Sequence, residues 1–299
     1  MEREISGVWP HGARSAVMLT FDVDAETVWL NGNAAYPDSE DWLGSVSLGH
    51  YGPRRAVPRL LNLLAKEGVR GTFFVPGYVV EHYPEAIREI VRAGHELGHH
   101  GYRHERFFDQ TPARQEAILL KSRRIFEDVL GYQAQGFRTP SGDFSRETPK
   151  LLQSLGFGYS SSMRGSDRPY RTVIDDGLSD FIEIPPRWEL DDFVLFAYNL
   201  FPAEPRGQDR ISAYGAGFDN YRREFDGYHR LGLCYVLMTH PQVIGKPGRV
   251  PHLAALIHHM KEAEPQGGTE AGGVWFATGS EVAEVWRLTH PREVAADGR

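Results

Sequence analysis

Two kinds of segment alternate along the chain, and they differ in the spacing of their apolar residues. Short runs rich in apolar and β-branched residues predict strands within residues 15–22, 71–77, 95–100, 136–140, 159–162, 181–185, 233–240 and 274–278. Helical spacing or boundary signals predict helices within residues 57–68, 84–93, 112–130, 147–155, 251–263 and 280–288, and in the second half of 208–231. This alternation predicts parallel strands joined by helical crossovers. We therefore expect one α/β domain spanning residues 1–299.

Residues 26–52 interrupt the alternation, because they are rich in Gly, Asn, Trp and Tyr and show no clear periodicity. We interpret them as a long active-site loop, since loops of this length are commonly functional. The loop directly follows the first strand, which places four aromatic residues where they can enclose a small ligand: Trp29, Tyr36, Trp42 and Tyr51. The alternative is that the segment packs into the core or contacts another subunit. The polar tail from about residue 290 onward is expected to be frayed.

The composition is that of a soluble globular protein, with 41% hydrophobic and 24% charged residues. The net charge of −7 and the lack of a basic run argue against nucleic-acid binding. The single cysteine, Cys234, excludes an internal disulfide and lies in an apolar run where a core position is expected. The first residues contain no long apolar stretch, so we expect no signal peptide, no membrane span and a cytoplasmic location.

Ionisable residues gather where the predicted strands end, and in parallel α/β folds the carboxyl ends of the strands carry the catalytic groups. Five strand ends carry such residues: Asp22 with Asp24, the histidines of residues 95–104, Arg138, Asp191 with Asp192 close to Trp188, and His240. Each alone is more often a cap, a surface ion pair or a loop residue, but their coincidence indicates one metal-hydrolytic site. One carboxylate and two imidazoles leave coordination positions open for water, which is the pattern of catalytic metal sites.

The stretch GHELGHHGYRHE, residues 94–105, holds four of the 13 histidines of the chain. Ligands four residues apart lie on one face of a helical turn, so both can reach one ion. Two pairs have this spacing, His95 with His99 and His100 with His104, and the spacing alone permits both. A solvated, histidine-rich loop is the alternative to a metal site.

Five short motifs resemble, in the same order, those of the polysaccharide deacetylases, also called the chitooligosaccharide deacetylase homology domain. They are TFDVD (20–24), HGYRH (100–104), GFRTPSG (136–142), WELDD (188–192) and MTH (238–240). The resemblance runs from about residue 15 to residue 285. It implies a distorted parallel (β/α) barrel of about seven strands. It also implies one divalent metal ion, zinc in the first instance, held by Asp24, His100 and His104.

The same resemblance implies roles for the other residues at the strand ends. Asp22 takes the place of the general base, and Arg138 is expected to orient it. His240 is expected to be the general acid, supported by Asp191 or Asp192, of which we prefer Asp192. The substrate is expected to contact Trp188, Pro140 and Arg249.

Two features depart from the usual motifs. Val23 separates the two acids of the first motif, although residues 22 and 24 of a strand share one face. The stretches SLGHYGPRRAVPRLL and HPQVIGKPGR resemble a branch that contains cyclic imide hydrolases, allantoinases and intracellular peptidoglycan-deacetylase homologues. We therefore expect a homo-oligomeric, metal-dependent hydrolase of non-peptide C–N bonds, acting on an N-acetyl sugar or on a small cyclic amide or imide.

Two alternatives remain from the sequence. A non-catalytic sugar- or metabolite-binding protein would use the same barrel, but the presence of both Asp22 and His240 speaks against it. A metal-independent, allantoinase-like hydrolase is disfavoured by the intact set of Asp24, His100 and His104.

Overall fold

The computed structural model describes residues 9–32, 43–197, 211–263 and 272–291. The strands of this part form one sheet: β1 Ser15–Asp22, β2 Thr72–Val75, β3 Glu96–His99, β4 Gly136–Phe137, β5 Tyr159–Ser160, β6 Tyr170–Ile174, β7 Gly177–Glu183, β8 Cys234–Thr239 and β9 Val274–Phe276. Their hydrogen-bonded order is β6-β7-β5-β4-β3-β2-β1-β8, and β9 also pairs with β1. Every pair is parallel except β6 with β7. The expected α/β class with mainly parallel strands is confirmed.

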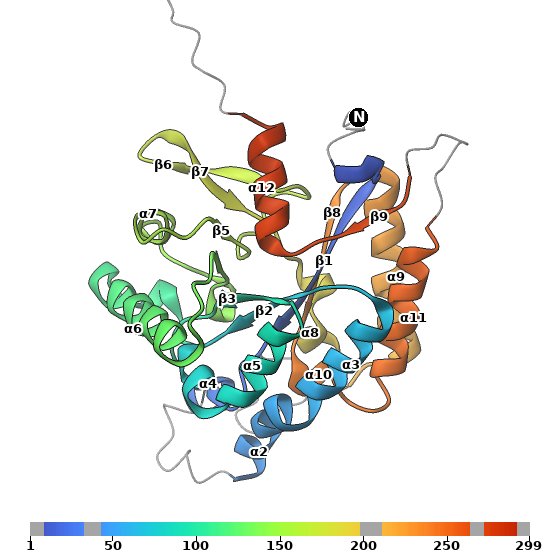
Figure 1. Cartoon of the computed structure of the whole chain (residues 1–299), viewed down its shortest axis with the longest axis horizontal. Coiled ribbons are helices and arrows are strands. Elements are labelled where there is room, and N and C mark those ends of the chain that lie inside the picture. Colours follow the sequence, from blue (N-terminus) through green and yellow to red (C-terminus); the bar gives the residue numbers. More distant parts are fainter. Residues whose placement is uncertain (1–8, 33–42, 198–210, 264–271, 292–299) are drawn as a thin grey trace, which may run out of the picture.

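Helices surround the curved sheet (Figure 1). They are α1 Thr27–Gly32, α2 Leu43–Tyr51, α3 Val57–Glu67, α4 Gly77–His82, α5 Pro84–Arg92, α6 Pro112–Leu130, α7 Thr148–Ser154, α8 Asp192–Phe196, α9 Tyr214–Leu231, α10 Pro241–Ile244, α11 Val250–Lys261 and α12 Gly279–Thr289. Shorter helical segments that bear on the site are η3 Gly52–Ala56, η5 Pro140–Gly142 and η6 Trp188–Leu190. An isolated parallel bridge between Asp191 and Met238 ties the segment after β7 to β8, at the far end of the strand order. The sheet therefore curls toward a distorted barrel.

Strand β1 is the centre of the core, and all eight of its residues are buried, as in a parallel strand covered on both faces. Leu19 and Phe21 belong to an apolar cluster that includes residues of α3, α5, α9 and α11. The alternate residues Ala16 and Met18 join a second cluster with Trp286 of α12. This packing fixes the carboxyl end of β1, at which the first acidic residues lie.

Both ends of helix α6 carry residues that are typical of helix boundaries. The side chain of Thr111 accepts a hydrogen bond from the backbone N–H of Arg114 at 3.3 Å, as an N-cap residue does. At the other end, Gly131 adopts a left-handed conformation with φ 61° and terminates the helix. Both predicted boundaries are confirmed.

Residues 26–52 are not the continuous loop that we expected, because their described part contains the helices α1 and α2. Helix α2 is rich in Gly and Ser and has no regular apolar face, so the sequence carried no helical signal. Tertiary packing stabilises it instead, and Gly49 lies directly against the backbone of Glu26. Trp29 is buried in the core, which was the alternative interpretation. Tyr36 and Trp42 lie outside the described residues, as does the tail beyond residue 291.

Strand β6 and the short helices α4, α8 and α10 were not predicted. Strand β6 lies at the edge of the sheet, and its residues are mostly half-buried without a consistent alternation. Its antiparallel pairing with β7 is what defines it, and that contact is not visible in a local pattern. Within the described ranges, no helix combines the length and the apolar character needed to cross a membrane.

Candidate active site

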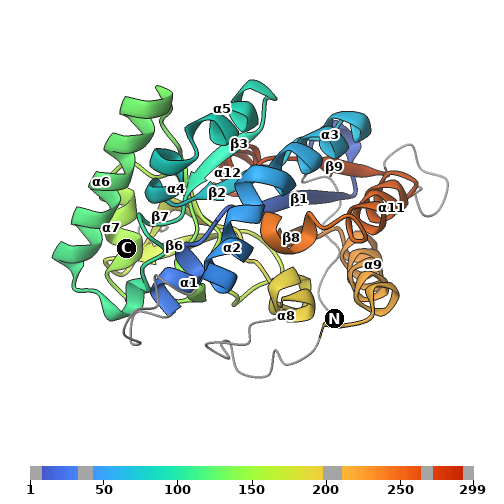
Figure 2. The same cartoon turned by 90° about the horizontal axis from the view of Figure 1, so that it is seen from below.

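The carboxyl ends of parallel strands bring the ionisable residues together. Asp22 is the last residue of β1, and three others directly follow a strand: His100 after β3, Arg138 after β4 and His240 after β8. The strand register aligns these ends with one another. Figure 2 views the molecule from this end, with α1, α2 and α8 beside it. The fold therefore brings these ionisable residues together at one end of the sheet.

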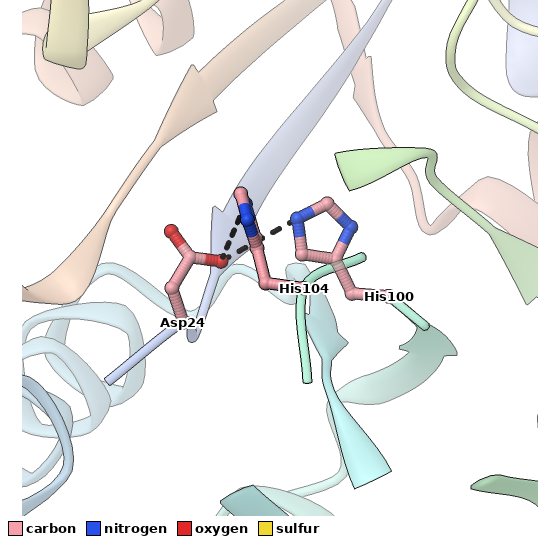
Figure 3. A group of neighbouring side chains, drawn as sticks. All are labelled: Asp24, His100 and His104. Atoms are coloured by element: carbon pink, nitrogen blue, oxygen red, sulfur yellow. Dashed lines mark ion pairs between the residues drawn. The ribbon is translucent and has the colours of Figure 1, made fainter. Parts of the chain in front are cut away.

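Asp24 faces the imidazole rings of His100 and His104 (Figure 3). Its Oδ1 atom lies 3.4 Å from Nε2 of His100 and 3.9 Å from Nε2 of His104. Asp24 and His100 are buried, and the side chain of His104 keeps 12% of its surface exposed. Oδ1 of Asp24 is also buried and accepts no hydrogen bond from the described residues. A buried carboxylate oxygen in this state is destabilising unless a cation or a donor satisfies it.

A hydrogen bond to the backbone fixes the orientation of the His100 ring. Nδ1 lies 2.8 Å from the carbonyl oxygen of Arg138, so Nδ1–H donates and Nε2 keeps its lone pair toward Asp24. Burial lowers the pKa of His100 to about 4, and it lowers the pKa of His104 well below its usual value. Both rings are therefore neutral near pH 7, which is the form that binds metal ions.

His100 and His104 converge through an irregular turn and not through the helical turn that their spacing suggested. Gly101 has φ 72° and His104 has φ 58°, and both values lie in the left-handed region. The carboxylate of Glu105 accepts hydrogen bonds from two backbone amides of the turn, each at 2.9 Å. This reversal of the chain, which local spacing does not reveal, brings both Nε2 atoms toward Asp24.

The other two histidines of the cluster contact different parts of the fold. Nδ1 of His99 lies 3.1 Å from Oγ of Ser122, and its ring packs 4.1 Å from the ring of Phe126. Nδ1 of His95 accepts a hydrogen bond from the backbone N–H of Gly71 at 3.2 Å, near the start of β3. The pair His95 with His99, which the spacing had allowed, is therefore excluded as a ligand pair.

Arg138 is 2% exposed and holds Asp22 within a network of hydrogen bonds. Its Nη1 donates to Oδ1 of Asp22 and to Oγ1 of Thr20, both at 2.8 Å. Nε and Nη2 donate to the carbonyl oxygen and the hydroxyl of Ser161, at 2.9 and 2.8 Å. The guanidinium also lies 4.2 Å from the centre of the Phe74 ring. Because several groups fix Arg138, the bound oxygen of Asp22 is fixed as well.

His240 lies on the other side of Asp24, with its Nε2 atom 3.7 Å from Oδ2 of that residue. Its Nδ1 atom donates to Oδ1 of Asp192 at 2.7 Å, whereas Oδ1 of Asp191 is 3.6 Å away. Burial lowers the pKa of His240, but the hydrogen bond and charge of Asp192, with the charges of Asp191 and Asp24, raise it overall to about 10. This imidazole is therefore protonated near pH 7. The distances favour Asp192 over Asp191 as its support.

The donor set around Asp24 fits a divalent metal ion. One carboxylate and two neutral imidazoles place one ligand atom each within 4.8 Å of one another, and these are the ligand types of catalytic zinc sites. Burial raises the pKa of Asp24 to about 8, partly opposed by His240, so the carboxylate gains from an added cation. Asp191, Asp192 and His240 also lie within 4.8 Å, but the short hydrogen bond between the last two already engages them.

Trp188 and Pro140, two of the residues expected at the substrate, belong to short helical segments that adjoin residues of the site. Trp188 in η6 is 48% exposed, and the guanidinium of Arg164 stacks 3.8 Å from its ring centre. Pro140 begins η5 and packs beside the histidine turn, where its Cγ atom lies 3.4 Å from the position of a Cβ at Gly101. Of these two residues, only Trp188 presents a large surface to solvent.

Arg249 and Gln242 have contacts that the sequence did not suggest. Arg249 is 4% exposed and donates to the carbonyl oxygens of Val243 at 2.7 Å and Phe196 at 3.0 Å, which does not support the expected substrate contact. Nε2 of Gln242 donates to Oδ2 of Asp24 at 3.4 Å. Proximity to the last motif was the only sequence signal for Gln242.

Known proteins are similar to this chain in both sequence and fold. The profile of the polysaccharide deacetylase family matches residues 50–160. The peptidoglycan deacetylase of Helicobacter pylori is 30% identical over 296 residues, which cover 91% of this chain and 96% of that protein.

Among solved structures, a Mycobacterium smegmatis protein assigned as a polysaccharide deacetylase superposes with a TM-score of 0.85 and 35% identity, covering 98% of each chain. The structure of Puue allantoinase has a TM-score of 0.77 over 97% of this chain and 95% of its own, but at 22% identity it shows a shared fold alone. Identity and coverage of this extent show that the chain belongs to the polysaccharide deacetylase family.

Proposed function

We propose that this protein is a divalent-metal-dependent hydrolase that removes the acetyl group from the nitrogen of an N-acetylated sugar. The observation that carries the proposal is the arrangement of three imidazoles around the buried carboxylate of Asp24. Nε2 of His100 and Nε2 of His104 face its Oδ1, which accepts no hydrogen bond from the described residues, whereas Nε2 of His240 faces its Oδ2. Burial lowers the pKa of His100 and of His104, whereas the hydrogen bond to Asp192 outweighs burial and raises the pKa of His240, and neighbouring groups whose pKa values are driven apart take different chemical roles, here metal ligand and acid.

Asp24, His100 and His104 would hold the metal ion. A bound ion would act as a Lewis acid, which lowers the pKa of a water molecule and polarises a carbonyl group. Two observations support this assignment: Oδ1 of Asp24 is buried and accepts no hydrogen bond from the described residues, and Nε2 of both histidines faces it. We propose zinc, because a three-ligand set of this type with open positions is typical of catalytic zinc.

Asp22 is the proposed general base. Arg138 engages its Oδ1 at 2.8 Å, while Oδ2 accepts no hydrogen bond from the described residues. That second oxygen is available to take a proton from the attacking water. Val23 is buried in the apolar core between the two acids, so its insertion directs Asp22 and Asp24 toward the site together.

His240 is the proposed general acid. Its Nε2–H gives a proton to the nitrogen as the C–N bond breaks, so that the products are acetate and a free amine. Asp192 binds Nδ1–H at 2.7 Å and stabilises the imidazolium before the reaction. A hydrogen bond in that position also fixes which ring nitrogen faces the substrate.

An N-acetyl sugar is favoured over a small cyclic amide for two reasons. The Helicobacter pylori relative is a peptidoglycan deacetylase, and the exposed face of Trp188 offers an apolar surface for a sugar ring. Two of the four aromatic residues that were expected to enclose a small ligand have other contacts. Trp29 is buried, and Tyr51 accepts a hydrogen bond from Arg59 at 2.8 Å and packs against Lys246.

The test strips the protein of metal with a chelator and reloads it separately with zinc, cobalt, nickel or manganese. Acetate release is measured from N-acetylglucosamine oligomers, and ring opening from succinimide and hydantoin, for the wild type and His104→Ala. We expect acetate release that the chelator abolishes, that a metal restores, and that the variant lacks. Metal-independent ring opening without acetate release would contradict the proposal and favour an allantoinase-like activity. Tight sugar binding without turnover of any substrate would instead favour a binding protein.

The metal identity, a homo-oligomeric state, a single catalytic domain and a cytoplasmic location stay predictions. Elemental analysis, light scattering of the purified protein, limited proteolysis and cell fractionation test them in that order.

A further inference from the structure

A cation that the motifs did not mark lies beside the acid–base pair. The guanidinium of Arg164 stacks on the indole of Trp188, 3.8 Å from the ring centre. Its Nη1 atom donates to the carbonyl oxygens of Gly142 at 2.9 Å and Ser162 at 3.0 Å. These bonds hold the cation in one orientation against a ring that is itself 48% exposed.

Gly142 makes the close approach of Arg164 and Trp188 possible. Its φ is +87°, and a Cβ atom there would lie 2.9 Å from Cη2 of Trp188 and 3.0 Å from Nη2 of Arg164. A side chain at this position would therefore displace one of them. Gly142 also ends the RTPSG motif that starts with Arg138, the residue that holds Asp22. The stacked pair thus packs against the same loop that carries Arg138, the residue that orients the proposed base.

Arg164 forms no ion pair with the described residues. Its Nε is buried without an acceptor there, and Nη2 donates to none of them. Three carboxylates act on Arg164 by their charge without forming an ion pair with it: Glu183 and Asp191 accept hydrogen bonds from backbone amides, and Asp143 is exposed to solvent. Burial, followed by the charge of Arg138, lowers the pKa of Arg164, and these carboxylates oppose the shift only in part. A partly buried cation in this state is stabilised when an anion binds to it.

Two segments connect the stacked pair to the proposed acid and base. Trp188 begins the η6 segment that leads to Asp191, and Asp191 lies 3.6 Å from Nδ1 of His240. The pair is therefore linked to the proposed base through Gly142 and to the proposed acid through η6. Nε and Nη2 form one edge of the guanidinium, and such an edge binds a carboxylate through two parallel hydrogen bonds.

We propose that Arg164 and Trp188 form a specificity site for acetamido sugars that carry a carboxylate. Trp188 contacts the face of the ring, and Arg164 binds the carboxylate. The matching class is an acetamido sugar with an acidic substituent. This inference rests on the proposed function, because the occupant is the substrate of the same site.

The test compares N-acetylmuramic acid with its methyl ester, which keeps the ring and removes the charge. Calorimetry gives the dissociation constants for the wild type, Arg164→Gln, Arg164→Lys and Arg223→Gln. Arg223 is an exposed residue of α9 that pairs with Asp219, so its variant controls for the loss of one positive charge. We expect the wild type and Arg223→Gln to bind the acid about tenfold or more tightly than the ester.

The ratio of the two dissociation constants should fall to about one in Arg164→Gln and stay intermediate in Arg164→Lys, which keeps the charge without the planar fork. Equal binding of acid and ester by the wild type would overturn the proposal, and so would failure of both ligands to bind. An unchanged ratio in folded Arg164→Gln would show that Arg164 only holds its loop. If Arg164→Gln does not fold, the ratio in Arg164→Lys decides the question in the same way.

Acetate release separates this inference from the proposed function. A wild-type protein that prefers the acid in binding but releases acetate from no substrate would refute the hydrolase and leave the carboxylate site standing. A protein that deacetylates neutral N-acetylglucosamine oligomers but binds the acid and the ester equally would support the hydrolase and refute the carboxylate site.

Discussion

Oδ1 of Asp192 accepts two hydrogen bonds from one residue, His240: from the backbone N–H at 3.0 Å and from Nδ1 at 2.7 Å. The backbone bond fixes the position of His240 and the ring bond fixes its tautomer. Nε2 is therefore directed toward Asp24, 3.7 Å away. Asp192 therefore both stabilises the protonated imidazole and directs its Nε2–H group toward Asp24.

Replacing Asp192 by Asn should lower the pKa of His240, because Asp192 contributes most to raising it against the effect of burial. An acid must be protonated to act, so activity falls as the pH rises through its pKa. The alkaline limb of the kcat/KM profile of Asp192→Asn should therefore move to lower pH. Asp191→Asn is the matched control and should cause a smaller shift, since Asp191 is 3.6 Å from Nδ1. An alkaline limb that stays in place in Asp192→Asn would assign it to another group.

Replacing His104 by Ala removes one of the three proposed metal ligands. Its metal affinity should fall by more than the about 10–100-fold that loss of an outer hydrogen-bond partner causes. The control is His99→Gln, because His99 is a neighbour in sequence but contacts Ser122 and Phe126 instead. Elemental analysis after dialysis and competition with a chelating dye measure the difference. Full zinc occupancy in His104→Ala would refute the ligand assignment.

Replacing Asp22 by Asn should lower turnover by about 10²–10⁴-fold, the range for a positioned acid or base. The amide still accepts a hydrogen bond from Arg138, so the fold and the metal content should stay close to those of the wild type. The measurement is single-substrate kinetics together with metal analysis of the same sample. Wild-type turnover in this variant would show that another group takes the proton.

The sequence predicted those parts of the site that depend on strand ends. Asp22, Arg138 and His240 each occupy the end of a strand with a strong local signal, and parallel pairing aligns such ends without further information. The choice of His100 as a ligand did not follow from spacing, because spacing alone could not separate it from His99. The resemblance to a family, not the physics of the local pattern, made that distinction.

Other features depend on contacts between segments that are far apart in the sequence. The turn that carries His104 is left-handed and is held by the carboxylate of Glu105, which no helical spacing predicts. The stack of Arg164 on Trp188 joins residues 24 positions apart across a glycine of a third segment. Arg249 lies in a motif and its substrate contact stays a prediction, but its Nη1 and Nη2 donate to backbone carbonyls that the motif did not indicate.

Helix α2 packs on the turn that follows Asp24, and Gly49 is the point of contact. A Cβ at Gly49 would lie 2.3 Å from Cα of Glu26 and 2.5 Å from the carbonyl carbon of Ala25. Ala25 has φ 49°, a left-handed conformation that a non-glycine residue keeps only when its surroundings enforce it. Tyr83 reinforces the turn by donating to the carboxylate of Glu26 at 2.9 Å. The position of a proposed metal ligand therefore depends on the seating of α2.

Replacing Gly49 by Ala should push α2 away from the turn and disturb Asp24 through the backbone. The free energy of unfolding should fall by about 1–3 kcal/mol, the usual effect of overpacking, and metal affinity should fall with it. Gly44→Ala is the matched control in the same helix, because a Cβ there meets nothing within 4 Å. That change should leave metal affinity unaltered and raise the free energy of unfolding by about 0.4–1 kcal/mol, because alanine restricts the unfolded chain more than glycine does. Denaturant unfolding and chelator competition measure both quantities for each variant. If Gly49→Ala loses stability but binds metal as tightly as Gly44→Ala, α2 supports the fold without positioning Asp24.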